Sequence, residues 1–354
     1  MMPKKAALFY EYPIKDGEVF GQGLRQTIEN LTDLYPEVVN AKNFDEHASN
    51  LGDIEVIFDT WGMPRLSDEQ LGKMPKLEAV FYAAGNVRAL AQPIVDNDVM
   101  LVGAWDMNAI PVVEMALAQV LLSCRGYYRT IRDDYESHDQ GKSKEFHRSE
   151  VNGETVGLIG MGMIGKRLSE LLTGFGFRVI AQDPFLSDEQ AMEIGVEKVS
   201  LEDLFSRAYI VSNHIPDLPS TKKVLDRALF DSMREGATLI NTGRGAQVDE
   251  AGLIATLKNR PDLTALLDVT YPEPPGAESD LWTLPNVWIS PHVGGSVGDE
   301  VVRMADCMIE EFQAWESGKP RRYRITKEVL ATMANVFSWM LQETCRLTSY
   351  HRTR

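Results

Sequence analysis

The stretch VGLIGMGMIG, Val156–Gly165, decides the fold of this chain of 354 residues. It begins as an apolar, strand-like run and ends in the spacing G-x-G-x-x-G, with glycines at Gly160, Gly162 and Gly165. The first glycine permits a tight turn, the second lets the backbone come close to a ligand, and the third lets the next helix pack on the strand. The stretch therefore predicts a strand that turns into a helix, which is the building unit of an α/β fold.

The residues after this turn complete a βαβ unit. A helical pattern covers Lys166–Leu172, and a second strand-like run, Phe177–Ala181, is followed by Asp183. The amino end of such a helix attracts a pyrophosphate, and a carboxylate after the second strand accepts hydrogen bonds from a ribose. Because a carboxylate at Asp183 would repel the 2′-phosphate of NADP, the pattern predicts binding of NAD. A glycine-rich turn without a ligand is the alternative, but it does not require this order of elements.

Similar strand-like runs recur along the whole chain, separated by helical segments. The first hundred residues contain four of them, at Ala6–Tyr10, Glu55–Phe58, Ala79–Tyr82 and Val99–Val102. A second series contains six, at Val156–Ile159, Arg178–Ala181, Tyr209–Ser212, Thr238–Asn241, Ala265–Asp268 and Val287–Ser290. The alternation predicts parallel sheets covered by helices, and the second series predicts a six-stranded, doubly wound sheet.

Helical patterns frame the second series. Pro111 opens the longest one, which runs to Arg125 without another proline or glycine, and proline is favoured in a first helical turn. The charged stretch 132–150 predicts an exposed helix or loop. A helix is expected over Val297–Trp315, and Lys327–Leu341 is an amphipathic segment to which the sequence assigns no role.

Composition and charge restrict the possible partners. Apolar residues make up 44% and charged residues 25%, as in ordinary globular proteins. Lys and Arg total 36 against 52 Asp and Glu, a net charge of −16. Such a charge argues against nucleic acid or an anionic membrane as a partner, although a small anionic substrate needs only local positive charge.

Other features concern the compartment. Cys124, Cys307 and Cys345 are far apart and lack CxxC spacing, which argues against disulfides and a zinc site and favours a reducing compartment. The amino terminus reads as a first strand rather than a signal peptide. No apolar run approaches the roughly 18–20 residues of a membrane helix. We therefore expect a cytoplasmic protein without a metal.

Three later segments place reactive side chains just past predicted strands. LINTGRG, Leu239–Gly245, holds Arg244 between glycines. LDVTYPEP, Leu267–Pro274, carries Glu273, and WISPHVGGS, Trp288–Ser296, carries His292. Open α/β sheets bind their ligands at the carboxyl ends of their strands, so the three side chains are candidates for one site.

Together with the G-x-G-x-x-G unit, these segments resemble the D-isomer-specific 2-hydroxyacid dehydrogenase family, which includes phosphoglycerate dehydrogenase, D-lactate dehydrogenase and glyoxylate/hydroxypyruvate reductase. The resemblance extends from about Phe81 to Trp315. It implies an NAD-dependent enzyme that interconverts a small D-2-hydroxy acid and its 2-keto acid by hydride transfer, without a metal.

The resemblance also implies roles for the three residues. Arg244 would hold the substrate carboxylate and polarise its carbonyl, His292 would be the general acid and base, and Glu273 would stabilise the imidazolium. Thr270-Tyr271-Pro272 departs from the family, many members of which carry an acidic residue soon after the Asp-Val pair. The alternatives are a solvated loop for Arg244, a helix cap for His292 and an ordinary loop acid for Glu273.

Further contacts follow from the same resemblance. The implied cofactor-binding residues are Gly160, Gly162, Met163, Ile164, Gly165, Asp183, His214, Pro216, Thr242, Gly243, Asp268 and Gly295. The implied substrate-binding residues are Ala84, Gly85 and Asn86, in addition to Arg244 and His292. Asn108 resembles part of the segment that opens the long interdomain helix.

The expected architecture is α/β with two domains and a cleft between them. Residues 1–106 would form a flavodoxin-like substrate-binding domain, residues 107–298 a doubly wound Rossmann domain for NAD, and residues 299–354 a segment returning to the first domain. Relatives imply a homodimer built through the helix that begins at Pro111. An NAD(H)-sensing, corepressor-like protein and another Rossmann enzyme, such as a hydrolase that uses NAD internally, are the alternative functions. The sequence names neither the substrate nor the physiological direction.

Overall fold

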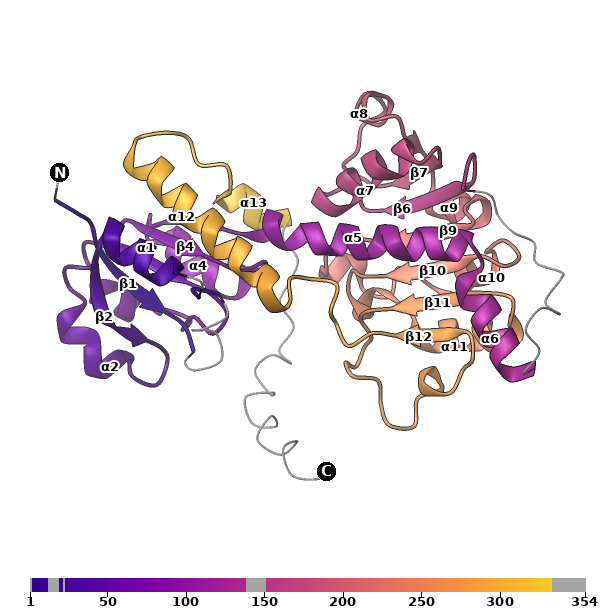
Figure 1. The fold of residues 1–354 in the computed structure, drawn as a ribbon, viewed down its shortest axis with the longest axis horizontal. Coiled ribbons are helices and arrows are strands. Elements are labelled where there is room, and N and C mark those ends of the chain that lie inside the picture. Colours follow the sequence, from indigo (N-terminus) through magenta and orange to yellow (C-terminus); the bar gives the residue numbers. More distant parts are fainter. Residues whose placement is uncertain (1, 12–18, 22, 138–150, 333–354) are drawn as a thin grey trace. The chain divides into compact units, whose positions relative to one another are not determined.

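The computed structural model describes residues 2–11, 19–21, 23–137 and 151–332 (Figure 1). The chain divides into two compact units. Of the described residues, 2–11, 19–21, 23–110 and 296–332 belong to unit 1, and 111–137 and 151–295 belong to unit 2. Each unit is built around its own sheet.

Unit 1 contains a six-stranded sheet in the order β13-β5-β4-β3-β1-β2. Its strands are β1 (Lys5–Phe9), β2 (Asp33–Val39), β3 (Val56–Asp59), β4 (Ala79–Tyr82), β5 (Met100–Gly103) and β13 (Arg324–Ile325). All pairs are parallel except β13 with β5. The four strands predicted in the first hundred residues are confirmed. The sequence did not reveal β2, which contains Pro36, because proline inside a strand is tolerated only at a sheet edge.

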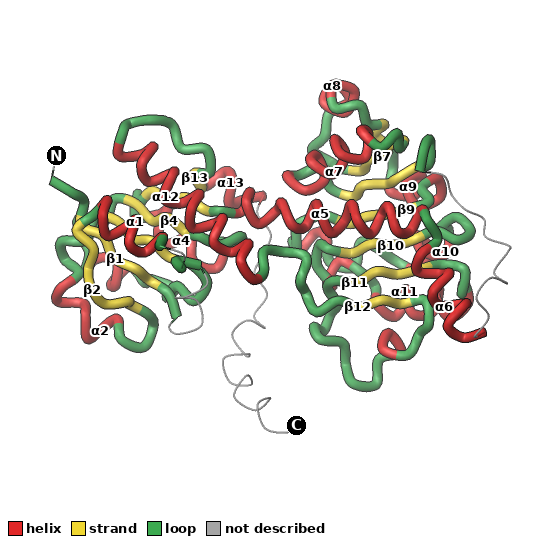
Figure 2. Tube along the Cα trace, in the orientation of Figure 1, coloured by secondary structure: helices red, strands yellow, loops and turns green. Residues whose placement is uncertain are grey.

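Helices cover both faces of this sheet, because successive residues of a strand point to opposite faces (Figure 2). One face packs against residues from α2 (Phe44–His47), α3 (Asp68–Gly72) and α4 (Arg88–Asp96). The other packs against α1 (Leu24–Leu31) and α12 (Val302–Glu316), where Phe312 lies 5.2 Å from Phe58 and 5.7 Å from Phe81 between ring centroids. The chain after Ser296 thus completes the core of unit 1.

Unit 2 contains a seven-stranded, parallel sheet in the order β12-β11-β10-β9-β6-β7-β8. Its strands are β6 (Thr155–Ile159), β7 (Arg178–Gln182), β8 (Glu197–Lys198), β9 (Ile210–Asn213), β10 (Thr238–Asn241), β11 (Thr264–Leu267) and β12 (Val287–Ile289). The winding reverses between β6 and β9, which is where doubly wound sheets bind dinucleotides. The prediction of six strands missed β8, a two-residue edge strand with both residues exposed and no apolar signal.

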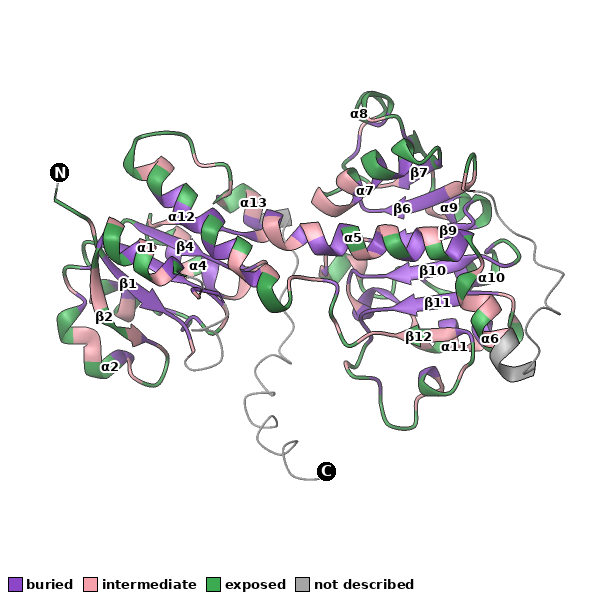
Figure 3. Cartoon of the chain, viewed as in Figure 1, coloured by how far each residue is buried: buried purple, intermediate pink, exposed green. Residues whose placement is uncertain are grey.

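The central strands β9, β10 and β11 of this sheet are fully buried, whereas the edge strands β8 and β12 are not, and helices pack on both faces of the sheet (Figure 3). One face packs against α5 (Trp105–Cys124), α7 (Met163–Gly174) and α8 (Asp188–Glu193). The other packs against α9 (Leu201–Arg207), α10 (Arg227–Asp231) and α11 (Glu250–Asn259). The remaining helices are α6 (Tyr127–Ser137), α13 (Lys327–Thr332) and the 3-10 turns η1 (Ala48–Asn50), η2 (Pro219–Thr221), η3 (Gly245–Gln247), η4 (Asp280–Trp282) and η5 (Gly298–Val301).

Helix α5 differs from its prediction. It begins at Trp105 rather than at Pro111, because the backbone N–H groups of Met107 and Asn108 already bond to the carbonyl of Ala104. Pro111 therefore lies inside the helix, where it lacks the N–H that would bond to the carbonyl four residues earlier. The division between the two units also falls at Pro111.

Among the described residues, α5 is the one helix long and apolar enough to cross a membrane by length and composition alone, although it contains Asp106 and Glu114 and is no uninterrupted apolar run. Half of its apolar window is buried in the structure. Val113, Ala116, Val120 and Cys124 belong to the core of unit 2, and a core helix of a globular protein has the same composition.

The helix predicted over Val297–Trp315 is present as η5 and α12. Of the amphipathic segment Lys327–Leu341, α13 is described and the part after residue 332 lies outside the described residues. The same holds for residues 138–150 of the charged stretch and for Cys345.

Candidate active site

Three predicted site residues follow neighbouring strands of unit 2. Arg244 follows β10, Glu273 follows β11 and His292 follows β12. Because these strands are parallel neighbours, their carboxyl ends meet at one edge of the sheet. The loops that carry the three side chains therefore belong to the same edge.

His292 and Glu273 are in direct contact. The Nδ1 atom of His292 lies 2.6 Å from Oε1 of Glu273, and the two side chains are 29% and 18% exposed. His292 has φ 54°, a left-handed conformation that residues other than glycine adopt rarely. The loop therefore holds the imidazole in a specific backbone conformation beside a carboxylate.

Asp268 shapes that loop. Its carboxylate is buried and accepts hydrogen bonds from Ser290 Oγ at 2.6 Å, Val293 N at 2.9 Å and Gly294 N at 2.8 Å. These donors lie on both sides of His292. The resemblance suggested a cofactor contact for Asp268, and the structure shows that its oxygens hold the histidine loop, which sequence reasoning missed.

Most N–H groups of the Arg244 guanidinium make no hydrogen bond to the described residues. Its Nη1 donates to the carbonyl of Gly243 at 2.6 Å, and no described carboxylate lies within ion-pair distance, 4.0 Å. Burial lowers the pKa of Arg244, and the carboxylates of Glu273, Asp217 and Asp268 oppose that shift. A partly desolvated guanidinium with unused N–H groups is a strong binding partner for a small carboxylate.

The two glycines that flank Arg244 are required by close contacts. A Cβ on Gly243 would lie 2.8 Å from Gln247 Oε1, and a Cβ on Gly245 would lie 2.0 Å from the backbone carbon of Thr270. The Arg244 loop is therefore packed tightly between its neighbours.

The glycine turn has the geometry that its sequence predicts. Gly160 has φ 89°, a conformation that favours glycine. A Cβ on Gly165 would lie 2.1 Å from the carbonyl oxygen of Gly160, so only glycine lets α7 approach the turn. A Cβ on Gly162 would meet no atom within 4 Å. Helix α7 starts at Met163, with Ile164 in its first turn, and no side chain caps its amino end. The open space at Gly162 and the uncapped N–H groups fit a pyrophosphate.

Asp183 supports the same turn. Its Oδ2 accepts a hydrogen bond from Met161 N at 2.7 Å, and its Oδ1 accepts one from Phe185 N at 2.8 Å. The carboxylate therefore stands at the carboxyl end of β7 and also holds the backbone between Gly160 and Gly162.

The loop after β9 lies next to the Arg244 loop. His214 Nε2 is 2.9 Å from Ser212 Oγ, and its Nδ1 is 3.3 Å from Thr242 Oγ1. Burial lowers the pKa of His214 to about 4, so this imidazole is neutral at pH 7. The carbonyl of Pro216 accepts a hydrogen bond from Thr221 Oγ1 at 2.8 Å.

Ala84, Gly85 and Asn86 belong to unit 1, after β4, whereas Gly295 is the last residue of this part of unit 2. Asn86 Oδ1 accepts a hydrogen bond from Arg88 N at 2.9 Å. A Cβ on Gly85 would lie 2.9 Å from Nδ2 of Asn108, so a larger residue would have to displace that side chain. The loop is thus tightly shaped within its own unit.

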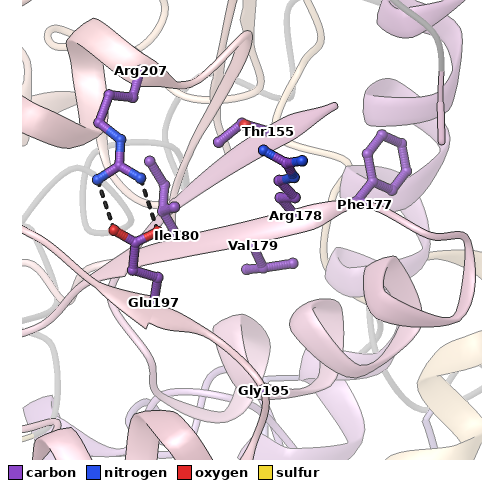
Figure 4. Close-up of a pocket in the computed structure, with 8 residues that line it drawn as sticks. All are labelled: Thr155, Phe177, Arg178, Val179, Ile180, Gly195, Glu197 and Arg207. Carbon is purple, nitrogen blue, oxygen red and sulfur yellow. Dashed lines mark hydrogen bonds and ion pairs between the residues drawn. The ribbon is translucent and has the colours of Figure 1, made fainter. Parts of the chain in front are cut away.

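A pocket of about 350 Å³ lies elsewhere on unit 2 (Figure 4). Its lining residues are Thr155, Phe177, Arg178, Val179, Ile180, Gly195, Glu197 and Arg207. Thr155 and Arg178 begin β6 and β7, so the pocket is at the amino ends of the strands, opposite to the candidate site. Its lining includes the ion pair of Arg207 with Glu197, both partly exposed (Figure 4). None of the predicted site residues lines it.

Comparisons with known proteins agree with this architecture. Residues 117–294 match the model of the D-isomer specific 2-hydroxyacid dehydrogenase, NAD binding domain. The chain is 34% identical over 218 residues to a putative 2-hydroxyacid dehydrogenase, YoaD, of Bacillus subtilis, covering 60% of this chain and 62% of that protein. It is 28% identical over 312 residues to D-3-phosphoglycerate dehydrogenase of Archaeoglobus fulgidus, covering 82% and 58%. The chain thus spans about three fifths of the length of these relatives.

Solved structures share the fold. A phosphoglycerate oxidoreductase from Rhizobium etli superposes with a TM-score of 0.77 at 24% identity, over 93% of this chain and 99% of that one. D-mandelate dehydrogenase of Rhodotorula graminis gives 0.75 at 22%, over 92% and 98%. The predicted α/β fold is confirmed. Since the matched NAD-binding domain makes up half of the 354 residues, the chain belongs to the D-isomer specific 2-hydroxyacid dehydrogenase family.

Proposed function

We propose that the protein is an NAD-dependent oxidoreductase that interconverts a small D-2-hydroxy acid and its 2-keto acid. One observation carries the proposal: the His292–Glu273 pair stands on the same sheet edge as the partly buried Arg244, within a domain of this family. An imidazole paired with a carboxylate can act as a general acid and base, and a guanidinium can bind the carboxylate of a substrate.

The glycine turn and its neighbours would hold the cofactor. Gly162 and the first turn of α7 would receive the pyrophosphate, and Asp183 would accept hydrogen bonds from the adenosine ribose. The rest of the cofactor would lie along the loops after β9 and β10, which carry His214, Pro216, Thr242 and Gly243. Bound NAD supplies or accepts the hydride at C2 of the substrate.

Arg244 would bind the substrate. Its guanidinium stays charged, because the ordinary pKa of an arginine lies far above neutral pH, and none of the described carboxylates forms an ion pair with it. Two parallel hydrogen bonds to the substrate carboxylate would fix the acid, and the positive charge would polarise the neighbouring carbonyl.

His292 would handle the proton. Its Nδ1 faces Glu273, so proton exchange with the substrate falls to Nε2. In the reducing direction Nε2 gives its proton to the keto oxygen, and in the oxidising direction it takes the proton of the hydroxyl group. Glu273 stabilises the imidazolium that forms when the histidine is protonated.

We also propose a cytoplasmic homodimer. Leu122 on α5 and Tyr127 and Ile131 on α6 are apolar side chains exposed at the surface of unit 2, which supports an interface along these helices.

The curated relatives bear dehydrogenase names, and no observation favours the cofactor-sensing corepressor.

The decisive experiment follows NADH absorbance with glyoxylate, hydroxypyruvate, pyruvate and bulkier branched or aromatic 2-keto acids. We expect at least one acid to be reduced, and Arg244→Lys to lower kcat/KM for it by about a hundredfold, because one ammonium cannot replace a bidentate fork. Arg207→Lys, at the opposite end of the strands, is the matched control and should be neutral. No turnover over the panel, with NADH still bound by fluorescence titration, would contradict the proposal.

A further inference from the structure

Three buried side-chain amides lie beneath the loops that follow β9 and β10. Asn213 is the last residue of β9, Asn241 the last of β10 and Gln247 the last of η3. Their exposed fractions are 0%, 1% and 0%. A buried amide without hydrogen bonds is more costly than an apolar side chain of the same size, so the partners of these amides explain their presence.

The amides bond to one another. Asn213 Nδ2 donates to Asn241 Oδ1 at 2.9 Å and to Gln247 Oε1 at 2.6 Å. The sheet makes this possible, because Asn213 stands opposite Asn241 in the register of β9 and β10. Asn213 is thus the centre of a short chain of amides that crosses from one strand end to the next.

On one side, the amides hold the backbone around Arg244. Asn241 Oδ1 accepts a hydrogen bond from Gly243 N at 3.1 Å, and its Nδ2 donates to the carbonyl of Arg244 at 3.3 Å. Gln247 Oε1 accepts one from Arg244 N at 3.1 Å. Both backbone polar groups of Arg244 are therefore bonded to this network.

On the other side, the same amides hold the loop after β9. Gln247 Nε2 donates to the carbonyl of Ile215 at 2.7 Å, and Asn213 Oδ1 accepts a hydrogen bond from Ile215 N at 3.3 Å. Both polar backbone groups of Ile215 are thus bonded as well. The two loops share one set of hydrogen bonds.

The orientation of each amide follows from a backbone partner. A carbonyl accepts only, so the Gln247 group facing Ile215 O is the NH₂, and its oxygen faces the N–H of Arg244. In the same way, the N–H of Ile215 directs Oδ1 of Asn213 toward it, which leaves Nδ2 to donate to the other two amides. A fully satisfied polar network specifies one arrangement, which apolar side chains do not.

The loop after β9 also carries Asp217. This carboxyl group is buried, and its Oδ2 has no hydrogen-bond partner among the described residues. Burial raises the pKa of Asp217, and the charge of Arg244 opposes that shift. A movement of this loop would therefore change the electrostatic surroundings of the arginine as well as its backbone support.

We propose that Asn213 and Gln247 are positioning residues for Arg244, and that they couple the loop of this arginine to the loop Asn213–Asp217 on the cofactor side. The inference rests on the proposed function for the role of Arg244, but the coupling itself is a property of the fold. Neither amide contacts substrate in this scheme. Each acts by holding the backbone from which the guanidinium projects.

The test compares two buried asparagines of unit 2. Asn213→Leu removes the centre of the network, and Asn286→Leu is the matched control, because the Asn286 amide is also buried and bonds to the carbonyls of Leu257 and Arg260 away from the site. We expect Asn213→Leu to raise KM for the preferred 2-keto acid about tenfold to a hundredfold, as misplacement of a binding group does. Asn286→Leu should change KM less than about twofold, even though both variants lower Tm.

A second readout needs no substrate. Asn213 makes no hydrogen bond to Gly243 or Arg244, so a local role would leave their amides protected. Coupling predicts that Asn213→Leu speeds amide hydrogen exchange at Gly243 and Arg244 by about tenfold relative to Asn286→Leu. The double variant Asn213→Leu/Gln247→Met should raise KM no further than Gln247→Met alone, because both changes break one network.

Unchanged exchange at Gly243 and Arg244, together with equal KM values for the two asparagine variants, would overturn the proposal. If the wild-type protein reduces no 2-keto acid, the proposed function fails, and the exchange measurement alone decides the coupling. The two conclusions are therefore separable.

Discussion

His292 Nδ1 lies 2.6 Å from Glu273 Oε1, although the two residues are 19 positions apart and follow different strands. Parallel neighbours β11 and β12 bring their loops together, and Asp268 holds the backbone on both sides of His292. The imidazole therefore meets its carboxylate through the geometry of the sheet edge rather than through local sequence.

Replacing His292 by Ala should lower kcat by about 10²–10⁴, because the proton of the substrate oxygen loses its acid and base. Binding of NADH, measured by fluorescence titration, should stay within about threefold, since the glycine turn and Asp183, which would hold the pyrophosphate and the adenosine ribose, lie on other loops. Glu273→Gln should lower kcat by a smaller factor, about tenfold or more, since the imidazole stays but its charged form loses a stabilising carboxylate.

His47→Ala is the control for these variants, because His47 bonds to Tyr35 in unit 1 and takes no part in the site. It should leave kcat unchanged. Full activity of His292→Ala would remove the histidine from the proposed mechanism.

Two glycines of the turn should respond differently to alanine. A Cβ at Gly165 would lie 2.1 Å from Gly160 O, so Gly165→Ala should destabilise unit 2 by about 1–3 kcal/mol or more in urea unfolding. A Cβ at Gly162 meets open space, so Gly162→Ala should keep the stability of the wild type while lowering NADH affinity about tenfold. Equal NADH affinity of Gly162→Ala and wild type would argue against a pyrophosphate at this position.

Asp183→Ser should relax the choice between cofactors. The loss of a carboxylate at the end of β7 removes its repulsion of a 2′-phosphate, so the ratio of kcat/KM for NADH and NADPH should fall by about tenfold. Tm should fall too, because Met161 N loses its acceptor. Asp188→Ser, at the exposed start of α8, is the control and should leave the ratio unchanged. A constant ratio in Asp183→Ser would mean that another group selects the cofactor.

Asp59 should make stability depend on pH. It lies at the end of β3 in the core of unit 1, with both carboxylate oxygens buried and without a partner among the described residues. Burial raises the pKa of Asp59 well above its ordinary value, so the folded state favours the neutral acid. The unfolded chain ionises near pH 4, so the stability that depends on the neutral form is complete below that pH. It is then lost as the pH rises toward the folded-state pKa.

Asp59→Asn removes this titration. Its free energy of unfolding should exceed that of the wild type by an amount that grows with pH above about 4, by at most about 1.4 kcal/mol per pH unit. Urea unfolding from pH 4 to 8 measures the difference. Asp53→Asn is the control, because Asp53 is exposed and paired with Lys5 on the surface, and it should show no such growth. Parallel stability curves for wild type and Asp59→Asn would contradict the prediction.

The sequence predicted the secondary structure correctly wherever neighbouring residues determine it. Apolar runs predicted four strands of unit 1 and six of unit 2, and the glycine spacing predicted the turn into α7. The exceptions have local causes too. Proline is rare inside strands, so Pro36 argued against a strand at β2, and the two charged residues of β8 carry no apolar signal. Pro111 is typical of a first helical turn, but the carbonyl of Ala104 already accepts the first hydrogen bonds of α5.

The sequence by itself determined the α/β fold, the glycine turn into α7 and the three loops that carry Arg244, Glu273 and His292, because glycine spacing and apolar periodicity act over a few residues. Only the tertiary structure decided how those loops are held. Asn213 is 28 positions from Asn241 and 34 from Gln247, and the three amides meet because β9 and β10 are neighbours in the sheet. Asp268 likewise holds residues more than twenty positions away. Hydrogen bonds between distant residues leave no periodic trace in a sequence, since the strand order alone sets which residues meet.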